Sequence, residues 1–171
     1  MARIDPPVWV IDTNVLLVAD RRHPAVSDAC VAACIERLIA IRQDGFVVLD
    51  DAWEIIGEYR HKTDADRGKT VAQVFLKWLL RNHGRWVTVH LEPHPLRVYL
   101  SFPADPDLVE FDPADRKFIA AAALAAAPVL EAADSKWLGW SPALLRHGIV
   151  VEFLCPEELH RFAVAKGLPI G

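Results

Sequence analysis

The stretch Val8-Trp9-Val10-Ile11-Asp12-Thr13-Asn14-Val15-Leu16 sets the fold class of the chain. Its first four residues form a short apolar run rich in β-formers, which is typical of a buried strand. Asp12 ends this run, and the apolar residues that resume at Val15 predict a helix after a brief turn. A carboxylate is therefore expected at the carboxyl end of the first strand, where ligands collect in parallel α/β sheets.

Short apolar strands and helical patterns alternate along the rest of the chain. After the first strand, the predicted strands cover residues 46–49, 86–89, 129–130 and 149–151. The predicted long helices cover residues 28–44, 53–59, 71–79, 113–127, 138–146 and 157–166. Such alternation implies right-handed crossovers and a parallel sheet covered on both faces. The expected fold class is α/β, a three-layer α/β/α sandwich with a central parallel sheet.

The length and composition fit one folded domain over residues 1–171. The chain has 53% hydrophobic and 25% charged residues, which allows a proper core and argues against disorder. Five prolines between residues 92 and 113 predict a surface excursion in place of a helix or strand. We find no domain linker in this segment.

Neither a signal peptide nor a membrane span is predicted. Asp12 interrupts the first apolar run too early for a signal-peptide core, and residues 118–127 are far shorter than the roughly 20 residues of a span. We expect a cytoplasmic protein. Cys30, Cys34 and Cys155 show no zinc-finger spacing, so we interpret them as buried core thiols, and their odd number fits a reducing compartment.

The formal charge of −4 argues against a protein that grips nucleic acid by bulk electrostatics. An RNA partner would need a local basic surface. The candidates for that surface are Arg21, Arg22, Arg60, His61, Lys62, Arg67 and Lys69.

Acidic residues stand at the predicted strand-to-helix junctions. Asp12 follows the first strand, Glu54 lies in the first turns of the helix after the second, and Asp134 follows the strand at 129–130. Asp112 and Asp115 open the helix that leads to that last strand. Hard oxygen ligands at one sheet edge suit Mg²⁺ or Mn²⁺, and like charges brought together require cations between them. The sequence therefore predicts an oxygen-only metal site.

Four segments in chain order resemble the motifs of the PIN-domain family of ribonucleases. They are the Asp12-Thr13-Asn14 stretch, Trp53-Glu54-Ile55-Ile56, Asp115-Arg116-Lys117-Phe118 before an Ala-rich helix, and Ala133-Asp134-Ser135-Lys136-Trp137. The resemblance, which spans nearly the whole chain, implies a PIN-like fold and a Mg²⁺- or Mn²⁺-dependent endoribonuclease. It implies Asp12, Glu54, Asp115 and Asp134 as catalytic acids, with Asp12, Asp115 and Asp134 as metal ligands.

The resemblance also suggests partners. They are an RNA substrate, a second copy of the chain in a homodimer and, for a VapC-like toxin, a small antitoxin protein. Two positions depart from the family pattern. Ala132 stands where the family often has Thr or Ser, and Lys136 where it often has a further acid. Both changes weaken the expected polar support around Asp134 and bear on a second metal ion.

Each candidate also has a structural interpretation. Asp12 could cap the helix after it, and Glu54 could be an ordinary first-turn acid. Asp112 fits the N-cap of the helix, with Pro113 at its first position and Asp115 at its third. The capping role of Asp112 favours Asp115 as the ligand. Asp112 is the substitute if the helix begins later. Three residues are expected to support the site: Asn14, Asp112 and Ser135. Glu58, one turn after Glu54, is interpreted as a solvated acid outside the site.

Three other functions compete with the ribonuclease. A haloacid-dehalogenase-like phosphatase also begins with a strand-end Asp, but it needs a second acid two residues on, where this chain has Asn14. A PIN-fold scaffold that binds RNA or protein is conceivable with a weakened metal site. A DNA structure-specific nuclease would need extra acids and a DNA-gripping helical region, which this short acidic chain lacks.

Overall fold

A five-stranded parallel sheet forms the centre of the computed structural model, which describes residues 7–23, 25–64, 69–92 and 95–168. The strands are β1 (Val8–Ile11), β2 (Phe46–Asp50), β3 (Trp86–Val89), β4 (Val129–Glu131) and β5 (Val151–Phe153). They lie in the order β3-β2-β1-β4-β5, and each neighbouring pair is parallel.

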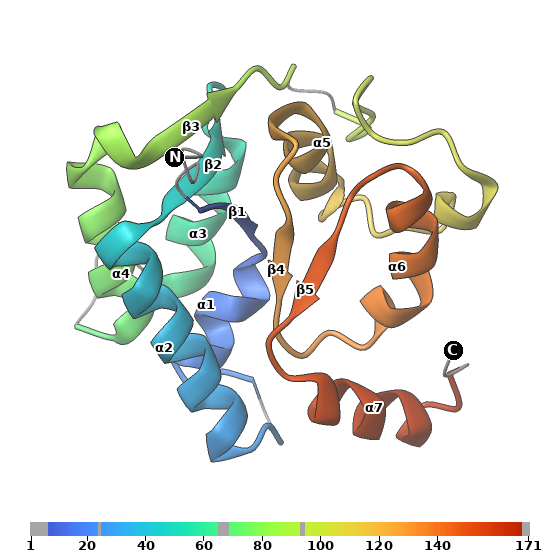
Figure 1. Cartoon of the computed structure of the whole chain (residues 1–171), viewed down its shortest axis with the longest axis horizontal. Helices are drawn as coiled ribbons and strands as arrows, with labels where there is room; N and C mark the ends of the chain where they lie inside the picture. The colour runs from blue at the N-terminus through green and yellow to red at the C-terminus, as the bar shows by residue number, and fades with distance from the viewer. Residues whose placement is uncertain (1–6, 24, 65–68, 93–94, 169–171) are drawn as a thin grey trace, which may run out of the picture.

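Helices cover both faces of the sheet. They are α1 (Thr13–Ala19), α2 (Asp28–Asp44), α3 (Glu54–Thr63), α4 (Val71–Arg81), α5 (Arg116–Ala125), α6 (Lys136–Arg146) and α7 (Pro156–Ala165). α1 to α4 contact one another on one side, whereas α5 packs against β1 to β4 and α6 against β5 on the other (Figure 1). This is the three-layer α/β/α class that the sequence predicts.

Buried apolar strands and local caps explain why these elements form. Val10, Ile11 and Leu130 are fully buried, as expected for strands covered on both faces. Thr70 and its partner Gln73 form a complete capping box at the start of α4, where the sequence places a cap. The carboxylate of Asp50 accepts the backbone N–H groups of the first two residues of α3.

Several predicted boundaries are off by one to four residues, and two of these differences bear on the site and the sheet. α5 begins at Arg116 and not at Pro113, because Asp112 accepts the N–H of Ala114 at 2.9 Å and closes a separate turn before the helix. β5 covers Val151–Phe153, two residues later than predicted. Gly148, at φ 74°, ends α6, and the next two residues carry the chain back toward the edge of the sheet.

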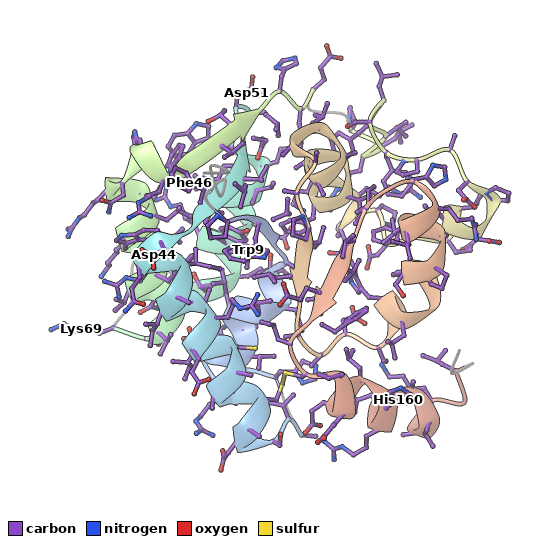
Figure 2. The ribbon with its side chains drawn as sticks, in the orientation of Figure 1. Trp9, Asp44, Phe46, Asp51, Lys69 and His160 are labelled. Carbon is purple, nitrogen blue, oxygen red and sulfur yellow. A yellow bond between two sulfur atoms is a disulfide. The ribbon has the colours of Figure 1, made fainter. Side chains whose placement is uncertain are left out.

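The cysteines also differ from the prediction of three thiols. Cys30 in α2 and Cys155 before α7 form a disulfide across 125 residues of sequence, visible as the yellow bond in Figure 2. Cys34 is a buried free thiol as expected, and burial raises its pKa to about 12. A cross-link over so long a loop reduces the conformational entropy of the unfolded chain, so the disulfide fixes α7 against the start of α2.

A separate finding concerns membranes. In the ranges that the structure describes, no helix is long and apolar enough to cross a bilayer.

Candidate active site

An open cleft of about 690 Å³ lies at the carboxyl ends of β1 and β4. The chain runs outward from β1 through β2 to β3, and then returns to place β4 on the other side of β1. The β1/β4 boundary is therefore the topological switch point, where parallel α/β sheets bind their ligands. The acids that line the cleft are Asp12, Glu54, Glu58, Asp112, Asp115 and Asp134.

Asp12 lies at the floor of this cleft. It is only 4% exposed, and its Oδ2 accepts the N–H of Asn14 at 3.1 Å, so it does cap α1. Burial raises its pKa well above the ordinary value, and the nearby carboxylates of Glu131 and Glu58 raise it further. The cap on α1 uses one oxygen of Asp12. It does not explain why this carboxylate is buried beside other acids.

Asp115 is half-buried just before α5. Burial raises its pKa to about 8, with further contributions from Asp12, Asp112, Glu58 and Asp134. Acids from three other segments, Asp12, Glu58 and Asp134, therefore lie near Asp115. Asp112 also lines the cleft, but its carboxylate holds the turn through Ala114. α5 does begin later than predicted, which was the condition for Asp112 as the substitute. Both acids line the cleft, and Asp115 makes no side-chain capping hydrogen bond, so Asp115 stays the preferred candidate.

The two glutamates of α3 have different surroundings. The Oε2 of Glu54 accepts a hydrogen bond from the phenol of Tyr99 at 2.6 Å. Glu58 is one turn further on, accepts from Thr13 Oγ1 at 2.6 Å, and raises the pKa values of both Asp12 and Asp115. The structure therefore brings Glu58 into the acidic cluster, although the sequence interpretation left it outside.

Lys117 is a buried cation that the sequence interpretation also missed. Its Nζ pairs with the carboxylate of Glu58 and donates to the carbonyl of Ala114. The side chain is 7% exposed and lines the cleft. A lysine in the apolar pattern of α5 was the available signal, because a buried lysine needs an acidic partner.

The segment after β4 carries Asp134. Its Oδ1 accepts the N–H of Lys136 at 3.1 Å, and its side chain lines the cleft. Asn14 supports this segment, because its Oδ1 accepts the N–H of Ala133 at 2.7 Å. Ser135 does not fit a supporting role in the cleft. It is 1% exposed, does not line the cleft, and its hydroxyl accepts from Lys166 at 3.1 Å.

Part of the predicted basic surface lies at the cleft. His61 and Lys62, near the end of α3, line it together with Arg97, which the sequence interpretation did not single out. The other candidates do not line the cleft. Arg21 forms an ion pair with Asp28, and Arg22 donates a hydrogen bond to the carbonyl of Lys62. Lys69 lies near α2 and α4, Arg60 is exposed, and Arg67 falls outside the described residues.

The chemistry of the cleft suits a hard divalent cation. Its donors are carboxylate oxygens. The pKa values of Asp12 and Asp115 are raised first by burial and then by repulsion from neighbouring acids, which a cation would relieve. The described trio of potential ligands with atoms within 4.8 Å of one another is Cys30, Cys34 and Cys155, and the disulfide occupies two of these. The acids are a wider set, which fits an ion that retains several waters, as Mg²⁺ does.

Comparisons with known proteins find distant structural likenesses. No family model matches the chain, and no curated protein does. One similar structure is that of VapBC2 from Rickettsia felis, solved in complex with a DNA fragment from the VapBC2 promoter. The similarity covers 85% of this chain and 98% of that chain, at 12% identity and a TM-score of 0.45. A domain of a functionally unknown protein from Methanocaldococcus jannaschii is similar at 15% identity and a TM-score of 0.42, over 86% and 90%.

Proposed function

We propose that the chain is a metal-dependent endoribonuclease that hydrolyses RNA phosphodiester bonds. The observation that carries the proposal is the convergence of Asp12, Glu58, Asp115 and Asp134 at the switch point of the sheet. Burial, followed by the acidic neighbours, raises the pKa values of Asp12 and Asp115. Such a cluster is costly in a folded protein unless it serves to bind cations. Asp12, Asp115 and Asp134 would hold Mg²⁺ or Mn²⁺.

A divalent ion bound there would supply an activated water and neutralise charge that develops on the phosphate. The chain's own groups have separate tasks. Glu58 is fixed from two sides by Thr13 and Lys117, so its carboxylate stays beside Asp12. Lys117 balances part of the negative charge without occupying a ligand position.

The rim of the cleft supports a polyanionic substrate. His61, Lys62 and Arg97 line the same opening as the acids, so successive phosphates could be bound outside the reacting one. Because the chain as a whole carries a net charge of −4, the attraction for phosphates would come from these three residues at the rim. The choice of RNA, and the further proposal of a homodimeric toxin with a small antitoxin partner, rest on the sequence resemblance to VapC-like PIN domains.

Two alternatives make different predictions. A phosphatase would use Asp12 as nucleophile and a general acid at position 14, but Asn14 instead accepts the N–H of Ala133 through its side-chain oxygen. A non-catalytic scaffold would not need buried acids to face one another. Asp134 still lines the cleft despite the departures at Ala132 and Lys136, which favours the enzyme.

The test is a cleavage assay with the purified chain. We expect internal cleavage of a labelled single-stranded or hairpin RNA with Mn²⁺ or Mg²⁺, and none with EDTA. A DNA strand of the same sequence and a phosphate monoester serve as matched substrates, and the RNA is expected to be cut fastest. Metal-dependent hydrolysis of the monoester with phosphorylation of Asp12 would replace the proposal with the phosphatase. A chain that binds RNA but cuts nothing would be the scaffold.

A further inference from the structure

Glu131, the last residue of β4, is a buried carboxylate with no place in the function proposed so far. It is fully buried and does not line the cleft, so it lies behind the floor that Asp12 forms. A glutamate in a central strand is expensive to bury unless its oxygens are bound on all sides. Its surroundings therefore indicate what it does.

One oxygen of Glu131 organises the turn that presents Asp134. Its Oε1 accepts the N–H of Ala132 at 3.0 Å and the N–H of Asp134 at 3.1 Å. Ala132 has no side-chain hydroxyl with which to order this turn. Glu131 thus supplies, from the preceding residue, the polar support that the sequence led us to expect was missing around Asp134.

Glu131 also lies beside Asp12 at the ends of two neighbouring strands. Ile11 pairs with Leu130 across β1 and β4, and the N–H of Asp12 donates to the Leu130 carbonyl at 3.0 Å, which brings the two acidic residues side by side. The Oε2 of Glu131 is buried and accepts no hydrogen bond from any group in the described part of the chain. Glu131 is also the first acidic neighbour that raises the pKa of Asp12.

We propose that Glu131 is a positioning residue: its Oε1 holds the turn that presents Asp134, at the strand end beside Asp12. In this way it sets the spacing of two metal ligands across the β1/β4 switch point. The inference rests on the proposed function, because it assigns to Asp12 and Asp134 the task of holding a divalent ion. Glu131 acts through these residues and does not reach the cleft itself.

Two substitutions separate positioning from direct ligation. In E131Q the side chain keeps an oxygen that can accept both N–H groups. In E131M a side chain of similar length offers no such oxygen. E157Q, at an exposed glutamate in the first turn of α7, is the matched surface control.

The first readout is hydrogen exchange of the Ala132 and Asp134 amides in the metal-free protein. We expect these two amides to exchange at least about tenfold faster in E131M, because they lose their acceptor, while E131Q and E157Q match the wild type. Equal protection in wild type and a folded E131M would overturn the proposal. This readout needs neither metal nor activity, so it stands even if the ribonuclease function fails.

The second readout is Mn²⁺ affinity, measured by calorimetry on the same proteins. E131M is expected to bind Mn²⁺ about 10- to 100-fold more weakly, the range found when groups that orient metal ligands are removed, and E131Q within about threefold of wild type. If E131M does not fold, E131Q decides. Retained affinity supports positioning, and a loss as large as that of D12N would make Glu131 a ligand and overturn it. A wild type without Mn²⁺ binding would refute the proposed function separately.

Discussion

Replacing Asp12 with asparagine is expected to lower metal-dependent RNA cleavage by about a thousandfold or more while the fold is kept. The carboxylate is the most buried acid lining the cleft, and its neighbours already disfavour its charge. Asparagine is nearly isosteric and its side-chain oxygen can still accept the N–H of Asn14, so the cap on α1 survives. Loss of the ligand removes the ion on which the chemistry depends.

The same substitution is expected to leave the metal-free protein as stable as the wild type, or more so. A buried carboxylate beside other acids costs folding free energy at neutral pH, and the neutral amide removes that cost. The measurement pairs RNA cleavage with thermal unfolding in EDTA. D44N, at an exposed aspartate at the end of α2, is the control. Cleavage by D12N at more than about a tenth of the wild-type rate would contradict the assignment.

The second large effect is a contrast between the two glutamates of α3. E58Q is expected to lower the cleavage rate about a hundredfold, because Glu58 alone of the two approaches Asp12 and Asp115. E54Q is expected to change it by less than about threefold, since glutamine can still accept the hydrogen bond of Tyr99. The two variants share a helix, a cleft and a chemical change, so each is the control for the other.

A complication is that E58Q leaves Lys117 without its ionic partner. An unpaired buried charge destabilises a protein, so unfolding by urea must accompany the kinetics. The double variant E58Q/K117M removes both charges and is expected to recover stability without recovering cleavage. If E54Q is as inactive as E58Q, the contrast is wrong and Glu54 is a catalytic acid, as the sequence resemblance implies.

The sequence was sufficient for the fold because its signals were local. The apolar run before Asp12, the Thr70 cap and the strand-helix alternation each depend on neighbours along the chain. The strand ends then brought Asp12 and Asp134 to one sheet edge without any knowledge of side-chain packing.

The rest of the site depends on contacts between distant segments. Glu54 and Glu58 lie one turn apart on the same helix, so the sequence could not distinguish them. In the structure, Tyr99 from the proline-rich excursion donates a hydrogen bond to Glu54, whereas Thr13, beside Asp12, donates one to Glu58. The Cys30–Cys155 disulfide joins residues whose spacing carries no signal. Glu131 was visible as a glutamate in an apolar strand, but the alternation of side chains could not tell what it faces.

The pKa shifts give the metal site a pH signature. Burial and acidic neighbours raise the pKa of Asp115 to about 8, and burial raises that of Glu131 to about 7. The folded protein therefore keeps protons that the unfolded chain releases from about pH 4 upward. Without metal, the free energy of unfolding should fall as pH rises from about 4 to 8, because the unfolded state binds fewer protons.

Thermal unfolding with and without Mn²⁺ tests most directly whether these acids form a metal site. In EDTA we expect Tm to be lower at pH 7.5 than at pH 5. Mn²⁺ at about a hundred times its Kd should raise Tm at pH 7.5 by about 5 to 10 °C, and much less at pH 5, where protons compete for the carboxylates. Identical Tm values in EDTA and in Mn²⁺ at both pH values would contradict a divalent metal site in this cleft.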